Sequence, residues 1–162
     1  MILYLIRHAW AAERDNERYP NDDLRPLTSD GKKRFAKMLD RLSDVKIRPT
    51  WIATSPLVRC RQTADILAKS LSKPVEIIEL VSLRPESDLG EVLAWTAQHK
   101  DEEIAWVCHA PAVSDFAAAL IGDGSAAIRF SKGSIAAIRF DQAVERNAGE
   151  LAWLATAGMM GV

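Results

Sequence analysis

Ile2-Leu3-Tyr4-Leu5-Ile6-Arg7-His8 is the stretch that decides the fold. Its five apolar residues show no alternation with polar ones, a pattern typical of a strand that is covered on both faces of a sheet. Arg7 and His8 end the apolar run, so two polar side chains follow the strand directly. The stretch therefore predicts a central strand of an α/β fold, with a candidate site at its carboxyl end.

Strand and helix patterns alternate along the rest of the chain. Helices are expected to begin at Thr28 or Ser29, at Ser55-Pro56 as N-cap and first helical position, at Asp88 and at Pro111. Further strands are expected at residues 51–54, 75–80, 104–108, 134–140 and 150–156. This order predicts a three-layer α/β/α sandwich with a mostly parallel central sheet, and the short connection between the last two strands predicts one antiparallel strand.

Length and composition limit the classes of protein. The chain has 162 residues, of which 48% are hydrophobic and 27% charged, and a formal net charge of -1. We expect one domain spanning residues 1–162 and no nucleic-acid partner, because no overall basic charge is present. No apolar stretch is long enough to cross a membrane and no signal peptide is evident, so we expect a cytoplasmic protein. The two cysteines, Cys60 and Cys108, imply no disulfide framework.

Polar residues follow three of the expected strands. These are the Arg7-His8 pair, the segment of residues 55–59 and the segment of residues 109–111. Open α/β sheets bind ligands in the crevice at the carboxyl ends of their strands. Arg59 lies in the first turn of a helix, where the helix dipole disfavours a cation unless an anion compensates it. The sequence therefore predicts an anion site at this edge, formed by His8, Arg59 and His109.

Each of these residues taken alone also has a structural interpretation. Arg59 alone is also compatible with a side chain that bends into solvent, and His8 or His109 alone with a structural histidine. His99 lies in a charged segment and is expected at the surface. A metal site of His8, His109 and Cys108 lacks a close ligand pair, so no metal is expected.

Other known catalytic patterns are missing from the sequence. It contains no G-x-S-x-G elbow, no Walker A loop and no G-x-G-x-x-G turn. Neither cysteine is followed by an arginine at the spacing of a thiol phosphatase loop, which argues against a cysteine nucleophile.

Four motifs resemble those of the histidine phosphatase, or phosphoglycerate mutase-like, superfamily. Residues 5–9 (LIRHA) resemble its R-H-G signature, and residues 55–64 (SPLVRCRQTA) its S-P-x-x-R-x-x-Q-T-A block. Residues 107–111 (VCHAP) resemble V-G-H-x-P, and residues 25–31 (RPLTSDG) resemble R-P-L-T-x-x-G. Within the superfamily the chain is most similar to the short SixA-type phosphohistidine phosphatases. Ala9 and Cys108 replace the usual glycines, and a positive φ at Ala9 would cost about 1 kcal/mol.

The resemblance implies a mechanism and its residues. His8 attacks phosphorus and forms a phosphohistidine that water then hydrolyses. Arg7 and Arg59 hold the phosphoryl oxygens, His109 donates a hydrogen bond to them, and Arg25 is a further substrate-binding candidate. Neither a cofactor nor a metal is required, because these side chains supply the positive charge. Glu86 and Asp88 are the candidates for a general acid, although Asp88 is also expected to cap a helix.

The expected substrate is inferred from the leaving group of the phosphoryl transfer. Imidazole, with a pKa of about 6.5, leaves with far less help from an acid than an alkoxide does. The polar loop of residues 11–27 also carries acidic side chains that would discourage small polyanions. We therefore expect phosphohistidine in a protein to be the substrate. Two alternatives stay open, which are a phosphatase for a sugar or nucleotide phosphate and a phosphate-binding module that has lost turnover.

Overall fold

The computed structural model describes residues 1–162 except for 46, 87 and 100–102. Its sheet has the strand order β3-β2-β4-β1-β5-β6, with β1 and β4 at the centre. The strands are β1 (Ile2–Arg7), β2 (Trp51–Thr54), β3 (Glu76–Glu79), β4 (Ile104–Cys108), β5 (Ile135–Arg139) and β6 (Glu150–Ala155). β1 pairs in parallel with β4, and β2 in parallel with both β4 and β3. β5 is antiparallel to β1 and to β6, which confirms the expected sheet with one antiparallel strand.

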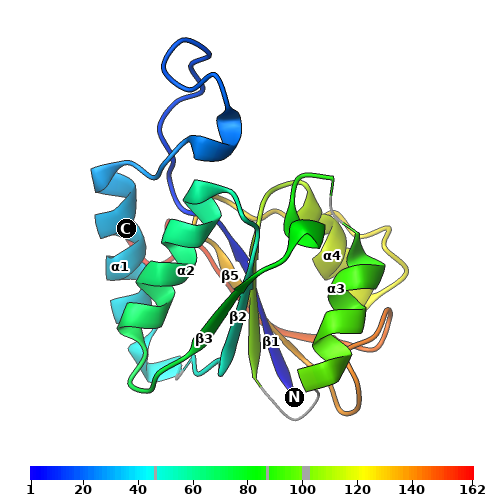
Figure 1. Ribbon diagram of the computed structural model, residues 1–162. Coiled ribbons are helices and arrows are strands. Elements are labelled where there is room, and N and C mark those ends of the chain that lie inside the picture. The colour runs from blue at the N-terminus through cyan, green and yellow to red at the C-terminus, as the bar shows by residue number, and fades with distance from the viewer. Residues whose placement is uncertain (46, 87, 100–102) are drawn as a thin grey trace.

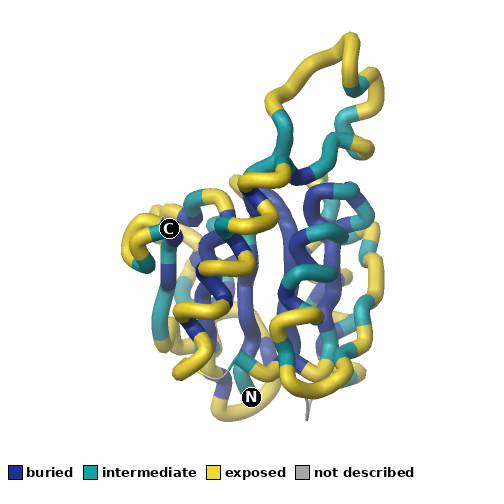
Figure 2. Tube along the Cα trace, turned by 90° about the vertical axis from the view of Figure 1, so that its left-hand side faces the viewer, coloured by how far each residue is buried: buried dark blue, intermediate teal, exposed yellow. Residues whose placement is uncertain are grey.

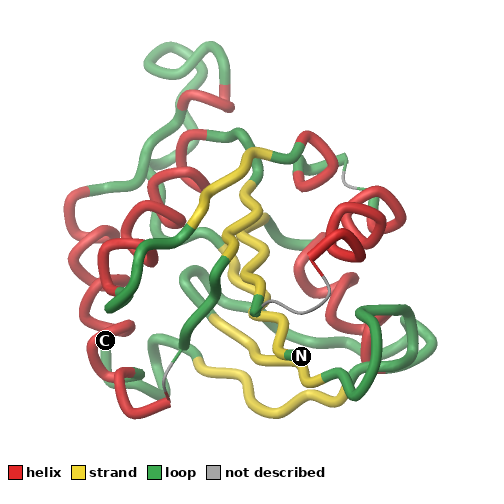
Figure 3. Tube along the Cα trace, turned by 60° about the horizontal axis from the view of Figure 1, so that its bottom comes forward, coloured by secondary structure: helices red, strands yellow, loops and turns green. Residues whose placement is uncertain are grey.

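Helices cover both faces of this sheet, as the sandwich prediction requires (Figures 1 and 3). α1 and α2 lie on one face, and α3 and α4 on the other (Figure 1). The helices are α1 (Ser29–Arg41), α2 (Val58–Ser70), α3 (Leu89–Thr96) and α4 (Ala112–Ile121). No helix among the described residues is long and apolar enough to cross a membrane.

The apolar run of β1 contributes to two hydrophobic cores. Leu3 and Leu5 pack in the core beneath α3 and α4, whereas Tyr4 and Ile6 pack in the core beneath α1 and α2. Successive side chains of a strand point to opposite faces, so an unbroken apolar run is needed where both faces are covered. This packing fixes β1 at the centre of the sheet and presents its polar end at the sheet edge.

Two local features differ from the sequence predictions. α2 begins at Val58 after an extended Leu57, so the prediction that Ser55 is the N-cap is wrong. The Ser55 hydroxyl bonds His109 instead, which leaves the helix without a side-chain cap. The polar segment of residues 11–27 projects from the sheet edge and is largely exposed (Figures 1 and 2), but it contains the 3-10 turn η1 (Asp22–Leu24).

Gly31 lets the chain after His8 pack onto the start of α1. Thr28 caps α1 through the Gly31 N–H at 2.8 Å, and its own N–H donates to the Trp10 carbonyl at 2.9 Å. A β-carbon at Gly31 would lie 2.2 Å from that carbonyl oxygen. The R-P-L-T-x-x-G motif thus fixes the segment that follows the candidate nucleophile.

We predict that Gly31→Ala lowers the free energy of unfolding by about 1–3 kcal/mol, since the added methyl group forces a backbone shift. Urea denaturation monitored by circular dichroism measures this loss. Gly158→Ala is the matched control, because a β-carbon there meets nothing within 4 Å. Equal stability of the two variants would contradict the packing described for Gly31.

Candidate active site

His8 lies at the carboxyl end of β1 and is 7% exposed. Its backbone N–H donates to the Cys108 carbonyl at 3.0 Å, which ties the ends of β1 and β4 together. Nδ1 lies 2.7 Å from the Ala9 carbonyl oxygen, which can only accept, so Nδ1 carries the proton and Nε2 does not. Burial is the main cause that lowers the pKa of His8 to about 3. At neutral pH this histidine is therefore uncharged, with a lone pair on Nε2.

Ala9 fits its position without backbone strain. Within the described chain the non-glycine residue with positive φ is Asn147, so the cost expected for a positive φ at Ala9 does not arise. The Ala9 N–H donates to the Thr63 hydroxyl at 3.1 Å, and that hydroxyl donates to the Arg59 carbonyl at 2.7 Å. Thr63 thereby links the segment after the candidate nucleophile to α2.

Arg7 and Arg59 each have a buried guanidinium nitrogen that lacks a partner. Arg59 is 4% exposed, which excludes the alternative that it bends into solvent. Its Nη1 donates to the Asp22 carbonyl, and Arg7 Nη1 donates to the Phe130 carbonyl. The Nε atoms of both arginines are buried and have no hydrogen-bond partner among the described residues. Unsatisfied buried N–H groups are rare, which makes both arginines candidates for binding an anion.

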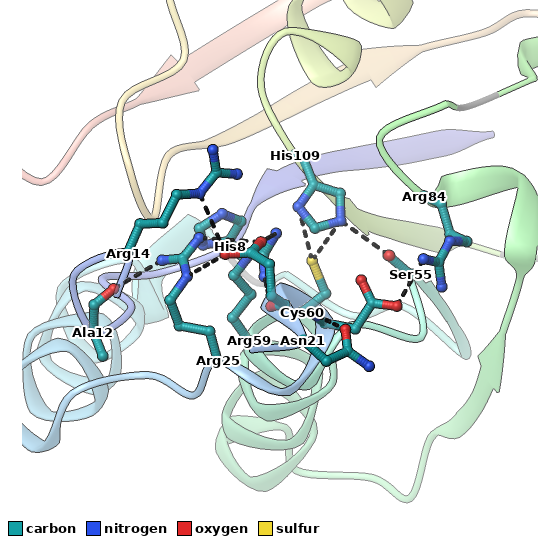
Figure 4. A network of polar contacts seen from close by, with 12 residues as sticks. His8, Ala12, Arg14, Asn21, Arg25, Ser55, Arg59, Cys60, Arg84 and His109 are labelled. Atoms are coloured by element: carbon teal, nitrogen blue, oxygen red, sulfur yellow. Dashed lines mark hydrogen bonds and ion pairs between the residues drawn. The ribbon is translucent and has the colours of Figure 1, made fainter. Parts of the chain in front are cut away.

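His109 follows β4 and lies beside His8 (Figure 4). Their ring centroids are 5.4 Å apart in an edge-to-face arrangement. His109 Nε2 is 2.9 Å from the Ser55 hydroxyl oxygen. Burial, aided by the positive charge of Arg59, lowers the pKa of His109 to about 4, so its ring is neutral as well. The structure thus brings together residues from the ends of β1, β2 and β4, as the sequence predicts.

Asp22 is a site residue whose position the sequence did not indicate. Its carboxylate accepts from Arg25 Nε at 2.8 Å and forms ion pairs with Arg59 at 3.1 Å and Arg14 at 3.5 Å. The hydrogen bond from Arg25 is the main cause that lowers the Asp22 pKa to about 2. The spacing of three residues between Asp22 and Arg25 was the available signal, but the contact with Arg59 joins segments distant in sequence.

The turn that carries Asp22 is attached to a second arginine. Asp23 forms an ion pair with Arg84 at 2.7 Å. The negative charges of Asp22 and Asp23 both raise the pKa of His109, against the larger effects of burial and Arg59. Figure 4 shows this network between Arg59, Arg84 and His109. The projecting loop is therefore connected to the site through two neighbouring carboxylates.

The remaining candidates differ in their connection to the site. Arg25 reaches it through Asp22 and also donates to the Ala12 carbonyl at 2.8 Å. Asp88 caps α3 by accepting from the Gly90 and Glu91 N–H groups. Glu86 is exposed, and no hydrogen bond or ion pair described here joins Glu86 or Asp88 to the two histidines. These two carboxylates therefore have no contact that supports a role as acid.

Two further features bear on the sequence predictions. His99 is half-buried against the rings of Trp51 and Trp95, near the start of β2 and away from the site. No group of three or more His, Cys, Asp or Glu side chains in the described part of the chain is placed to hold a metal ion.

Comparisons with known proteins agree with this geometry. The family model of the histidine phosphatase superfamily (branch 1) matches residues 3–92. An uncharacterized protein of Picosynechococcus sp. (strain ATCC 27264 / PCC 7002 / PR-6) is 37% identical over 123 residues, 74% of this chain and 73% of that protein. The phosphohistidine phosphatase SixA of Escherichia coli (strain K12) is 28% identical over 145 residues, 88% of this chain and 87% of SixA.

A solved structure matches nearly the whole fold. The structure of the protein histidine phosphatase SixA complexed with tungstate superposes with a TM-score of 0.83 at 24% identity and covers 99% of both chains. The family model also spans more than half of this chain, including His8 and Arg59. The chain therefore belongs to branch 1 of the histidine phosphatase superfamily.

Proposed function

We propose that this protein is a phosphatase that transfers a phosphoryl group to Nε2 of His8 and then to water. The proposal rests mainly on one observation. An unprotonated histidine nitrogen lies in a buried site with two guanidinium groups whose Nε atoms have no hydrogen-bond partner within the described part of the chain. A phosphoryl group supplies an electrophilic phosphorus to the nitrogen and acceptor oxygens to the arginines.

The reaction has two steps in this proposal. In the first, the Nε2–P bond forms as the bond from phosphorus to the leaving group breaks, and the leaving group takes up a proton from water. In a phosphohistidine substrate the ring nitrogen that is not bonded to phosphorus takes up this proton beforehand, so that neutral imidazole leaves. Arg7 and Arg59 hold the equatorial oxygens, and His109 donates a further hydrogen bond to them. In the second, water attacks phosphorus, and the Nε2–P bond breaks to regenerate neutral His8 and release inorganic phosphate.

We further propose phosphohistidine in a protein as the substrate. Asp88 is engaged as a helix cap, and Asp22 has a pKa of about 2 and accepts hydrogen bonds from arginine. The Asp22 carboxyl group therefore offers no proton at neutral pH, and the Asp88 carboxylate is occupied by the N–H groups at the start of α3. An imidazole leaving group, with a pKa of about 6.5, depends least on such a proton. The similarity to SixA of E. coli, whose name is phosphohistidine phosphatase, supports the same substrate class.

We predict that His8→Ala abolishes turnover of an aryl phosphate and of a phosphohistidine protein, because no other group replaces the nucleophile. Circular dichroism should show a native fold, since the change removes a polar side chain at the sheet edge. His99→Ala is the control and should keep wild-type activity, as its ring packs against Trp51 and Trp95. Substantial hydrolysis by a folded His8→Ala protein would refute the mechanism.

We predict a higher kcat/KM on a phosphohistidine protein than on monophosphate or bisphosphate sugars. The reason is the leaving group, because a sugar alkoxide needs an acid that the site does not supply. A substrate panel at pH 7 with release of inorganic phosphate as the readout measures the ratio. A preference for a sugar phosphate would overturn the substrate assignment while leaving the role of His8 intact.

We predict that Asp22→Asn binds orthovanadate roughly tenfold more tightly than the wild type, since the Asp22 carboxylate competes with the anion for Arg59 and Arg25. Isothermal titration calorimetry measures the change. Asp23→Asn is the matched control, because it neutralises the neighbouring residue, whose ion pair is with Arg84 instead. If Asp22→Asn binds vanadate as weakly as Asp23→Asn does, the carboxylate is not a competitor.

A further inference from the structure

His109 has two buried neighbours that the proposed mechanism does not use. The Ser55 hydroxyl oxygen lies 2.9 Å from Nε2, and the Cys60 sulfur lies 3.4 Å from the same nitrogen. Ser55 and Cys60 are both fully buried, at 0% exposure. We propose that Ser55, supported by Cys60, is a positioning residue that holds His109 in the tautomer with its proton on Nδ1. The role of Ser55 in catalysis rests on the proposed function, whereas the tautomer of His109 does not depend on it.

The position of one proton decides whether His109 can act on a phosphoryl group. A neutral imidazole carries its proton on one nitrogen and has a lone pair on the other. Nε2 points to Ser55, whereas Nδ1 points to the side of the ring on which His8 lies (Figure 4). A phosphoryl oxygen only accepts hydrogen bonds, so His109 can stabilise it only with the proton on Nδ1. The same oxygen would be repelled by a bare Nδ1.

The Ser55 hydroxyl favours that arrangement because it needs an acceptor. Two acceptors lie near it, which are Nε2 of His109 and the Cys60 sulfur. Sulfur is a weak acceptor, and an imidazole nitrogen is a strong one. A fully buried hydroxyl that makes no good hydrogen bond is destabilising. The hydroxyl hydrogen is therefore directed to Nε2, which must then be the unprotonated nitrogen.

Cys60 also favours the tautomer of His109 that carries its proton on Nδ1. Burial raises the pKa of its thiol well above the ordinary value, so the sulfur keeps its hydrogen. The contact of this thiol with Nε2, at 3.4 Å, is shorter than its contacts with the Cys108 carbonyl, at 3.7 Å, and with Nδ1 of the same ring, at 3.8 Å. A protonated thiol beside Nε2 offers a second hydrogen to that nitrogen and no good acceptor for a proton on it. Both neighbours therefore disfavour the tautomer with the proton on Nε2.

Long-range ¹H–¹⁵N correlation spectra test the tautomer directly on the ¹⁵N-labelled full chain at pH 7. The sequence has three histidines, and the signals of His8 and His99 are assigned with His8→Gln and His99→Gln. We expect the pattern of an Nδ1–H tautomer for His109 in the wild type and a mixture of tautomers in Ser55→Ala with Cys60→Ala. An Nε2–H pattern in the wild type, or an unchanged pattern in the double variant, overturns the proposal.

Steady-state kinetics provide the functional test. Ser55→Ala should lower kcat by about tenfold or more with little change in KM, because the lost donor acts on charge in the transition state. Ser134→Ala is the matched control, since it removes an equally buried hydroxyl that bonds Ser131 rather than a histidine. A loss of kcat in Ser55→Ala without any tautomer change would assign Ser55 a merely structural role. Inactivity of the wild type with an Nδ1–H His109 would instead refute the proposed function alone.

Discussion

Parallel pairing of β1 with β4 sets Arg7 opposite Cys108, and every feature of the site depends on that register. The residue after each of these two is a histidine, so the two rings meet at the carboxyl ends of β1 and β4. A shift of the register by one residue would turn the side chains of β1 to the other face and separate the histidines. The apolar side chains of β1, divided between two cores, are what prevent such a shift.

Around the two histidines, burial and the positive charges of neighbouring arginines act on the protonation states in the same direction. Both histidines are neutral because burial disfavours their charged forms, and neighbouring arginines add to the effect. The arginines are attached at their outer nitrogens to Asp22 and to backbone carbonyls, which leaves each Nε for an incoming anion. The hydroxyl of Thr63 joins the Ala9 amide to the Arg59 carbonyl, so the segment after His8 and one arginine are held by a common residue.

The sequence predicts the fold and the position of the site well because both follow from short-range patterns. The apolar run of β1, the helical stripes and the polar residues after each strand are properties of neighbouring residues, and the fold class that they predict is confirmed. Asp22 and Ser55 could not be assigned in this way. The contact of Asp22 with Arg59 joins distant segments, and Ser55 exchanges an expected helix cap for a bond to His109. A helix cap is a local preference of the sequence, and here the Ser55 hydroxyl makes a tertiary hydrogen bond with His109 instead of capping α2.

The central position of β1 also affects when its contacts can form during synthesis. Leu3 pairs with Ile104 on one side and with Ile138 on the other, so the two neighbours of this strand are made long after it during synthesis. Contacts of such high sequence separation form slowly, because a long stretch of chain must first be ordered. Until β4 and β5 have been synthesised, the apolar side chains of β1 can associate with wrong partners. His8 thus leaves the ribosome early, but the site around it is complete only after β4 has paired with β1 and the chain has been made as far as Phe130, whose carbonyl holds Arg7.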